Sequence, residues 1–316
     1  MLIQTTSPEK AVGSRCTVCD GDQWNFVRRG CDLYQPGCEE SFELYRCLSC
    51  GQVMQNPLPT PEQLSKAYSA EYAPYRPAWK ETGWPLWKVF RELTTRRRMR
   101  RLRRYGKGRK LLEVGCGAGD FLHAAHGAGW EVAAVEYSVA LTDELCRELG
   151  FDVRAGELTR GLWQPGSFDV VALFSVIEHL RNPHEVLVTA SSYLRTGGVV
   201  FIQIPTLRGV ELGKEFGQYW ALLDLPRHLS FFSRECLTEL CDQAGMKLIV
   251  FQTGLLETAW CYFQSLVNYA TFSRKPERRV KRLALLALRC VLFFPSMVVR
   301  AYKGHGTEAF AVAVKR

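Results

Sequence analysis

The chain of 316 residues is long enough for one α/β domain and a smaller second module. A hydrophobic fraction of 47% with 12% aromatic residues excludes a disordered chain. The formal net charge of +9 is concentrated in residues 96–110 and 274–303, which predicts an anionic partner such as a phosphorylated substrate, a membrane surface or RNA. Twelve cysteines occur, and no charged segment followed by an apolar one opens the chain. We therefore expect a reduced, cytoplasmic protein in which some thiolates bind metal.

Two Cys-x-x-Cys pairs lie near the start of the chain. The first pair is Cys16 and Cys19, and the second is Cys47 and Cys50. Two such pairs typically supply four thiolates to one tetrahedral zinc ion, so the spacing predicts a zinc ribbon over residues 1–58, with a strand entering the second pair. The alternative is a set of reduced cysteines without metal. Because so small a module has little hydrophobic core, zinc would supply much of its folding free energy.

A helical linker or lid is predicted over residues 59–105. Thr60 and Gln63 form a capping box with proline at the first helical position, which predicts a helix from about 61 to 68. The paired cysteines followed by Asn-Pro-x-Pro-Thr resemble a group of bacterial methyltransferases with an N-terminal zinc ribbon. Aromatic residues over 71–90 indicate either a lid over the site or ordinary packing between two modules.

A run of arginines follows at residues 96–104. Met99 and Leu102 interrupt the run and give one apolar face to a basic helix. Its remaining surface is either simply solvated or attracted to phosphate or anionic lipid.

A glycine-rich turn is the central motif. Glu113 lies in an apolar strand, Gly115, Gly117 and Gly119 follow at alternate positions, and Asp120 opens a helix. Glycines allow a sharp backbone path, and the helix start offers unpaired N–H donors to a ligand. The dinucleotide fingerprint needs a small residue where Asp120 stands, which argues against NAD. The turn resembles motif I of the class I S-adenosylmethionine (SAM)-dependent methyltransferases, and this implies contacts to SAM from Glu113, Gly115, Cys116, Gly117, Gly119 and Asp120.

The next three strands add further candidates for the SAM site. The strand over 130–136 ends at Glu136, about twenty residues after the turn, where nucleoside-binding folds place a carboxylate on the ribose hydroxyls. The resemblance implies that Glu157, after a short third strand, lies where relatives hold the adenine. A fourth, buried strand ends at Phe174, which we expect to pack near the sulfonium or the adenine.

The segment after the fourth strand matches a signature of the same superfamily. Residues 175–183 read Ser-Val-Ile-Glu-His-Leu-Arg-Asn-Pro. They resemble the pattern of an apolar residue, Glu-His, an apolar residue, two variable residues and Pro that is seen also in the quinone O-methyltransferases of the superfamily. In those enzymes an E-x-x-E-H arrangement is associated with a divalent metal. Here Ser175 replaces the first acid, so we expect no catalytic metal. His179 is a candidate base near the methyl group, or it orients the loop and closes the SAM pocket.

The loop after the fifth strand carries the predicted acceptor site, because open α/β sheets bind ligands beyond the strand ends. It contains Trp220, Asp224, Arg227 and His228 and resembles an element of sugar- and polysaccharide-type methyltransferases. We expect Trp220, Asp224 and Arg227 to bind the acceptor, with Arg227 on a phosphate or carboxylate. His228 is the first choice for the base because its near-neutral pKa suits a hydroxyl acceptor, and His179 is the second. A purely structural His228 is the alternative.

The end of the chain completes the predicted fold. We expect a last, antiparallel strand over 307–314 and, before it, a helical insertion at about 254–304. The apolar stretch 283–299 has basic flanks and predicts an interfacial helix on an anionic membrane, with packing or dimerisation as the alternative. The predicted fold is therefore α/β: a Rossmann-like seven-stranded methyltransferase sheet in residues 106–316, a small zinc ribbon and a helical insertion.

These features predict a SAM-dependent methyltransferase with a structural zinc ion. The expected acceptor is a small molecule or a lipid-linked glycan, and the expected reaction is an O-methylation in polysaccharide or secondary-metabolite biosynthesis. C-methylation of a nucleotide-linked sugar is a further option, since that family also has N-terminal zinc cysteines. The alternatives are an RNA methyltransferase and a non-catalytic adaptor. Nucleic acid is disfavoured because no Asn/Asp-Pro-Pro-aromatic tetrapeptide follows the fourth strand. We expect a cytoplasmic protein in peripheral contact with the inner face of the membrane.

Overall fold

A computed structural model describes residues 15–35, 40–68, 85–273, 284–288, 303 and 305–316. Most of the aromatic segment 71–90 and most of the apolar stretch 283–299 lie outside these residues, although 284–288 are helical. The lid and the interfacial helix therefore stay predictions.

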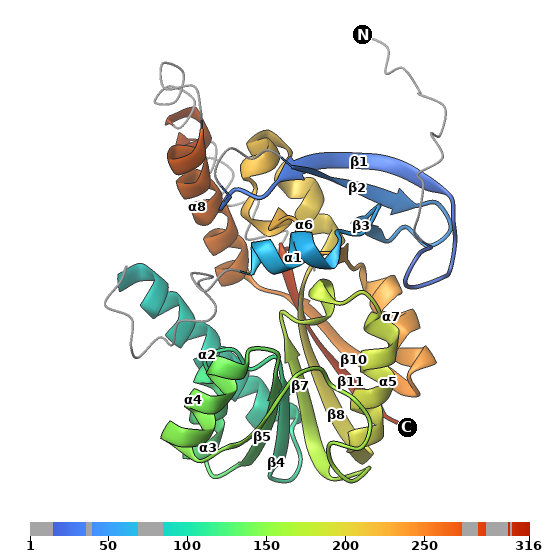
Figure 1. The fold of residues 1–316 in the computed structure, drawn as a ribbon, viewed down its shortest axis with the longest axis vertical. Helices are drawn as coiled ribbons and strands as arrows, with labels where there is room; N and C mark the ends of the chain where they lie inside the picture. Colours follow the sequence, from blue (N-terminus) through green and yellow to red (C-terminus); the bar gives the residue numbers. More distant parts are fainter. Residues whose placement is uncertain (1–14, 36–39, 69–84, 274–283, 289–302, 304) are drawn as a thin grey trace.

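A mixed sheet of seven strands forms the body of the molecule (Figure 1). Its strands are β4 (Lys110–Val114), β5 (Glu131–Glu136), β6 (Asp152–Ala155), β7 (Phe168–Phe174), β8 (Leu194–Pro205), β10 (Met246–Thr253) and β11 (Glu308–Lys315). The strand order is β10-β11-β8-β7-β4-β5-β6. Neighbours from β8 to β6 are parallel, whereas β11 is antiparallel to both β8 and β10. This confirms the predicted Rossmann-like sheet with an antiparallel last strand.

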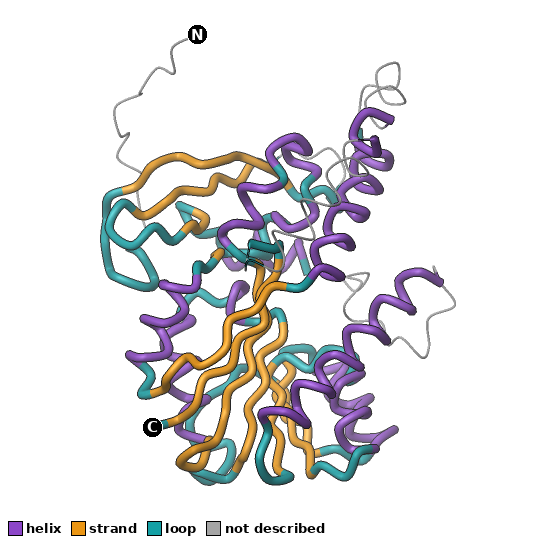
Figure 2. Tube along the Cα trace, turned by 180° about the vertical axis from the view of Figure 1, so that it is seen from behind, coloured by secondary structure: helices purple, strands orange, loops and turns teal. Residues whose placement is uncertain are grey.

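Helices cover both faces of the sheet, as seen from behind in Figure 2. Alternate residues of β7 belong to separate cores: Val170 and Ala172 pack with α2 (Pro85–Tyr105) and α3 (Asp120–Gly127). Val171 and Leu173 pack with α5 (Pro183–Tyr193) and α7 (Arg234–Gln243). The helix α4 (Val139–Leu149) covers β5 and β6. Burial on both faces explains why these parallel strands are continuous apolar runs.

A second, antiparallel sheet carries the cysteine pairs and lies across the top of the larger sheet in Figure 1. It consists of β1 (Trp24–Cys31), β2 (Ser41–Cys47), β3 (Val53–Gln55) and β9 (Ser230–Phe231), in that order. We call the part formed by residues 15–35 and 40–55 the ribbon. Its fourth strand, β9, comes from the loop predicted to bind the acceptor. No pattern in the sequence indicates this pairing, because β9 has only two residues.

The ribbon shares its hydrophobic cores with the rest of the protein. Leu44 and Val53 pack in one core with Trp220 and Tyr262. On the other face, Met54 belongs to the same core as α5 and α7. The ribbon is therefore built into the body of the molecule rather than attached to it by a linker.

Several shorter elements lie between the two sheets and around them. Thr60 and Gln63 form the predicted capping box at the start of α1 (Pro61–Ala67), which lies below the ribbon in Figure 1. After β8 come α6 (Leu207–Leu212), two 3₁₀ helices (Lys214–Tyr219 and Ala221–Leu223) and, beyond β10, α8 (Leu255–Phe272).

The predicted basic helix is α2, which begins earlier than the arginine run. Met99 and Leu102 are buried, as expected for its apolar face. Arg97 forms an ion pair with Glu257 at 3.0 Å, and the Arg101 guanidinium lies 3.9 Å from the centroid of the Phe310 ring. Part of the run therefore packs inside the protein instead of facing solvent.

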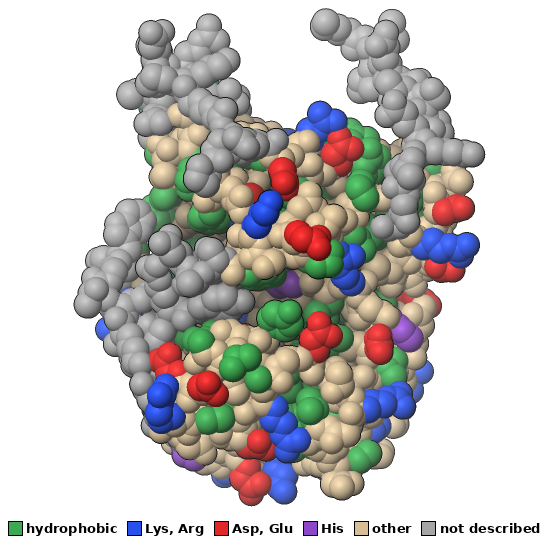
Figure 3. All heavy atoms as spheres, viewed as in Figure 1, with side chains coloured by type: hydrophobic (Ala, Val, Ile, Leu, Met, Phe, Trp, Pro, Cys, Tyr) green, Lys and Arg blue, Asp and Glu red, His purple; other side chains and the backbone are tan. Residues whose placement is uncertain are grey.

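Acidic and basic side chains are interspersed on the face of the molecule seen in Figure 3. No extended surface of one sign appears among the described residues visible there, which gives no support to an RNA-binding face on this side. None of the described helices has the length and hydropathy needed to cross a membrane.

The shared core predicts that the ribbon and the larger sheet unfold together. Leu44→Ala removes a side chain that is fully buried, so we expect the free energy of unfolding to fall by about 2–5 kcal/mol in a single transition. The matched control Leu86→Ala, at a site that is 55% exposed, should change it by less than about 0.5 kcal/mol. Denaturant unfolding followed by tryptophan fluorescence and circular dichroism measures both. If unfolding occurs in two separate transitions and Leu44→Ala shifts the denaturant midpoint of only one of them, the ribbon unfolds independently of the larger sheet.

Candidate active site

The glycine turn after β4 has the backbone that the sequence motif requires. Gly115, Gly117 and Gly119 all have positive φ, at +67°, +52° and +76°. A Cβ on Gly115 would lie 2.8 Å from Val176, and one on Gly119 would lie 2.7 Å from Leu145. Gly119 is also the N-cap of α3 and has no side chain to cap it. The first N–H groups of α3 are therefore left for a ligand at the turn.

Glu136 lies at the end of β5, beside the turn. Its side chain is buried, and its Oε2 accepts a hydrogen bond from the Gly117 N–H at 2.9 Å while Oε1 accepts from the Ser138 N–H at 2.9 Å. Each carboxylate oxygen has a second lone pair, so both can also accept from vicinal hydroxyls. The Gly156 N–H bonds the Glu136 carbonyl at 2.9 Å, which brings the exposed Glu157 next to the same edge.

Glu113 is a buried acid with an unsatisfied oxygen. It is 3% exposed, and its Oε2 has no hydrogen-bond partner among the described residues. Burial raises the pKa of Glu113 to about 8, although the charge of Arg98 opposes this shift. A buried acceptor without a partner fits a cationic ligand, such as the amino group of SAM, because such a group would both pair with the carboxylate and favour its ionised form.

Three other predicted SAM residues are buried in the protein or paired within it. Asp120 forms an ion pair with Arg91. Cys116 is 9% exposed, and burial raises the pKa of its thiol well above the usual value. Phe174 is 5% exposed and packs edge-on against Phe121, with the Arg98 guanidinium 4.2 Å from its ring centroid. Phe174 thus lies in the core behind the site, and its contact with SAM stays a prediction.

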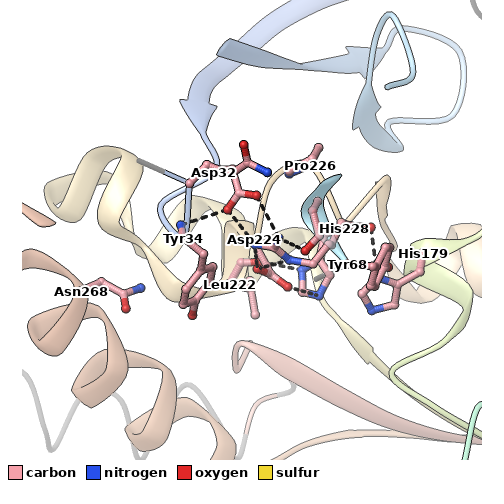
Figure 4. A network of polar contacts seen from close by, with 12 residues as sticks. Asp32, Tyr34, Tyr68, His179, Leu222, Asp224, Pro226, His228 and Asn268 are labelled. Carbon is pink, nitrogen blue, oxygen red and sulfur yellow. Dashed lines mark hydrogen bonds and ion pairs between the residues drawn. The ribbon is translucent and has the colours of Figure 1, made fainter. Parts of the chain in front are cut away.

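Two histidines meet beyond the strand ends (Figure 4). The ring centroids of His179 and His228 are 4.9 Å apart. His179 Nδ1 lies 3.0 Å from the Arg227 carbonyl oxygen and 2.9 Å from the Tyr68 hydroxyl, and His228 Nδ1 lies 2.8 Å from the Leu222 carbonyl oxygen. A carbonyl oxygen can only accept, so we assign the proton of each ring to Nδ1. Both Nε2 atoms then keep a lone pair.

Burial keeps these two rings neutral. Burial, together with a smaller effect of the neighbouring His228, lowers the pKa of His179 to about 3. Burial also lowers the pKa of His228 from 6.5, but the carboxylate of Asp224 acts against that shift. Asp224 Oδ2 lies 4.0 Å from His228 Nε2. Of the two rings, His228 is therefore the one with a carboxylate placed to stabilise it when a proton arrives.

Glu178 adds a second buried acid without partners. It is 1% exposed, neither of its carboxyl oxygens has a hydrogen-bond partner among the described residues, and burial raises its pKa well above the usual value. One ligand atom each from Glu178, His179 and His228 lie within 4.8 Å of one another, so this group could hold a cation. Ser175, which replaces an acid of the quinone-enzyme motif, is exposed and outside this group.

Arg227 does not have the role that the sequence predicted. Its side chain is 1% exposed, and all five N–H donors are used within the protein. Nη1 donates to Asp32 and to the Ala67 carbonyl, Nη2 donates to Asp32 and Asp224, and Nε donates to Asp224. No donor is left for a phosphate or carboxylate of an acceptor, so the predicted substrate contact of Arg227 is wrong.

Trp220 and Asp224 also face the protein interior. Trp220 is 1% exposed, and its Nε1 donates to the Gly209 carbonyl at 2.9 Å. Its predicted contact with the acceptor is corrected to a place in the core shared with the ribbon. Asp224 has a positive φ of +34° and divides its oxygens between Arg227 and His228. The charge of Arg227 lowers the pKa of Asp224 although burial acts to raise it.

The four cysteines of the two pairs converge at one end of the ribbon. One sulfur from each of Cys16, Cys19, Cys47 and Cys50 lies within 4.8 Å of the others. Cys16 and Cys50 have sulfurs 3.5 Å apart, and Cys19 and Cys47 have sulfurs 3.6 Å apart. A tetrahedral site with Zn–S bonds of about 2.3 Å has S···S edges of about 3.8 Å, so the group fits zinc.

The chain is similar to known methyltransferases. Residues 87–250, just over half of the chain, match the family of methyltransferase domains. The chain belongs to this family. Its seven-stranded sheet is that of the class I SAM-dependent methyltransferase fold.

Two curated relatives and one solved structure are similar to this chain. The ubiquinone biosynthesis O-methyltransferase of Methylococcus capsulatus is 34% identical over 100 residues, which are 30% of this chain and 42% of the relative. The enzyme of the same name from Idiomarina loihiensis is 26% identical over 54% of this chain and 76% of the relative. The chain thus spans less than half of the length of the first of these two relatives. The geranyl diphosphate C-methyltransferase of Streptomyces coelicolor A3(2) has the same fold, with a TM-score of 0.50 and 16% identity over 81% of this chain and 98% of that one.

Some residues of the site carried no signal in the sequence. Asp32 and Gln55 lie in the ribbon, outside any recognised motif, and they reach the acceptor loop only through the fold. Glu178 was part of a recognised signature, but its complete burial and missing partners depend on the tertiary structure. Tyr68 could have been found from its place after the capped helix, although not its contact with His179.

Glu113→Gln should change stability and SAM affinity in opposite directions. The pKa of Glu113 is raised in the folded protein, so the acid favours folding below the unfolded value of 4.5 and loses that contribution as pH rises towards about 8. At pH 8 without SAM, the neutral glutamine variant should therefore have the higher melting temperature. SAM binding should be weaker by about tenfold or more, because a charge-assisted hydrogen bond is lost. Thermal unfolding and calorimetry measure the two effects, and a variant that binds SAM as well as the wild type would contradict the assigned contact.

Proposed function

We propose that this enzyme transfers the methyl group of SAM to a phenolic hydroxyl oxygen of a small acceptor, with His228 as the base. The observation that carries the proposal is the placement of His228: its Nδ1 lies 2.8 Å from the Leu222 carbonyl oxygen, and its Nε2 lies 4.0 Å from the carboxylate of Asp224. With the proton assigned to Nδ1, Nε2 keeps its lone pair. Such a ring can accept a hydroxyl proton, and the carboxylate then stabilises the imidazolium that forms.

The donor site supports this reading because it adjoins the histidines. Val176, which touches the Gly115 position, stands two residues before Glu178 and three before His179. We propose that Glu136 holds the ribose, that Glu157 lies near the adenine, and that the glycine turn with Glu113 and Asp120 holds the methionine part. When bound, SAM supplies a methyl group on a positively charged sulfur. The protein then has to align the acceptor oxygen with that methyl, remove its proton and exclude water.

His228 is a better base than His179 in this arrangement. A pKa of about 3 makes His179 too weak a base at neutral pH, and no carboxylate is seen within ion-pair distance of its ring among the described residues. His179 Nδ1 is held by Tyr68 and by the Arg227 carbonyl, which suits a ring that shapes the site. We propose that His228 takes the proton and that His179 positions the acceptor.

The lowered pKa of His228 favours an acidic hydroxyl. A phenol has a pKa of about 10, whereas water, like an aliphatic alcohol, lies near about 16. A weak base can take up the phenol proton during methyl transfer far more readily than an alcohol proton. The name of the relatives, ubiquinone biosynthesis O-methyltransferases, also supports an oxygen acceptor. A lipid-linked glycan acceptor and a membrane contact have only sequence patterns in their favour.

His228→Ala should lower kcat by about 10²–10⁴-fold while SAM affinity stays unchanged, because the residue acts on the acceptor proton. In the wild type, kcat/KM for a catechol or phenol should be flat above pH 6.5 and should fall at lower pH, since the pKa of His228 lies below 6.5 and its protonated form is no base. Methyl transfer is measured with labelled SAM across a panel of phenols, sugar alcohols and glycans.

Two results of that panel would contradict the proposal. Full activity of His228→Ala on its best acceptor would remove His228 as the base. Transfer to sugar hydroxyls alone would replace the phenol with a glycan acceptor. His184→Ala, a partly buried histidine on α5 away from the cluster, is the control variant.

We also propose that the four cysteines bind a structural zinc ion. Elemental analysis of the purified protein should give about one zinc ion per chain. The double variant Cys47→Ser, Cys50→Ser should lose the metal and much of its stability, whereas Cys146→Ser, an exposed cysteine on α4, should retain both. Unchanged zinc in the double variant would refute the site.

A further inference from the structure

The segment that carries His228 is held from the ribbon side. Residues 224–229 lie between a 3₁₀ helix and β9 and form no helix or strand themselves. Two main-chain hydrogen bonds hold this segment from outside the ribbon: the His228 N–H donates to the Asp224 carbonyl at 3.1 Å, and the Leu229 N–H donates to the Glu178 carbonyl at 2.7 Å. Further hydrogen bonds to the main chain of this segment come from Gln55 of the ribbon.

Gln55, the last residue of β3, makes three of these bonds. Its backbone N–H donates to the Leu229 carbonyl at 2.8 Å. Its side-chain Nε2 donates to the carbonyls of Pro226 and His228, each at 2.8 Å. Gln55 is fully buried, so water cannot replace these bonds. One ribbon side chain thus fixes the main chain on both sides of Arg227.

Asp32, just beyond β1, provides the second link (Figure 4). It is 6% exposed and receives both terminal nitrogens of Arg227, at 3.0 and 3.1 Å. Arg227 also donates to Asp224 Oδ1, and the other oxygen of Asp224 faces His228 Nε2 at 4.0 Å. The carboxylate beside His228 is therefore oriented through Arg227 by a ribbon residue.

We propose that Gln55 and Asp32 are positioning residues for His228, so that the ribbon forms part of the catalytic site and contributes to its activity. The inference rests on the proposed function, because it takes His228 as the base. Gln55 sets the place of the imidazole through the main chain, and Asp32 sets the carboxylate that stabilises the protonated ring. Neither residue touches the substrate. The ribbon thus contributes to turnover itself, in addition to stability.

Gln55→Met tests the first link, because methionine keeps the side-chain volume and the backbone bond to Leu229 but has no N–H to donate. We expect kcat to fall by about tenfold or more, since small displacements of a reacting group are costly. The Kd for SAM and the KM for the acceptor should stay unchanged. The control is Gln52→Met, which is equally buried in the ribbon but bonds Cys16 and Thr17 instead of the acceptor loop. An equal loss of kcat in Gln52→Met would overturn the proposal in favour of general ribbon integrity.

The double variant Gln55→Met, His228→Ala separates this inference from the function on which it rests. If Gln55 acts through His228, its substitution should cause no further loss once His228 is absent. If the two losses multiply, the positioning role fails and the base stands. If His228→Ala alone keeps full activity, the proposed function fails, and a loss confined to Gln55→Met would then show that Gln55 acts without His228.

Asp32→Asn tests the second link through the pH profile. The titratable and charged groups around His228 are Asp224 and Arg227 on its own segment, Glu178 and His179 on the turn after β7, and Asp32 on the ribbon. Removing the negative charge of Asp32 leaves Arg227 less compensated, so the protonated ring is less stable. The acid limb of kcat should move to lower pH, and kcat at neutral pH should fall. Lower activity with an unmoved acid limb would mean that Asp32 has only a structural role.

Discussion

The buried guanidinium of Arg227 is the contact on which the arrangement of ribbon, acceptor loop and histidines depends. A charge in the protein interior is costly unless partners satisfy all of its donors, and here two carboxylates and one carbonyl do so. Removing one partner of such a group typically costs about 3–5 kcal/mol, because the remaining charge stays buried without compensation. The ribbon is therefore attached to the body by a contact specific in charge and geometry, as well as by apolar packing.

The charges on the two sides of the site complement the proposed reaction. On the donor side, the raised pKa of Glu113 keeps that acid largely protonated near neutral pH, so the free enzyme does not bury an unpaired carboxylate. A cationic ligand would reverse this balance and favour the ionised form. On the acceptor side, both imidazoles are neutral, and Asp224 is kept ionised by Arg227. A proton that leaves the acceptor would thus move towards a negative charge already in place.

Local patterns in the sequence were enough to predict the larger sheet and the glycine turn that follows β4. The glycine turn, the acid that ends β5 and the capping box at Thr60 depend on neighbours within a few residues, and each is visible in the chain itself. The pairing of β3 with β9 and the saturation of Arg227 depend on residues far apart in sequence. From the sequence alone, Arg227, next to His228 in the loop predicted to bind the acceptor, is interpreted as a substrate ligand. Its pairing with Asp32 is visible only in the folded structure. For the same reason Gln55 could not be recognised, since a glutamine at the end of a three-residue strand has no pattern of its own.

Arg227 also connects the two histidines. Its guanidinium orients Asp224 towards His228, and its carbonyl accepts from His179 Nδ1. That carbonyl fixes the tautomer of His179, because a ring whose Nδ1 donates has only Nε2 left to face the site. The same residue is held in place by Gln55, which bonds the carbonyls on either side of it. A displacement of the ribbon would therefore disturb both rings together, which is why the contribution of the ribbon should be measured in kcat and in the pH profile as well as in the free energy of unfolding.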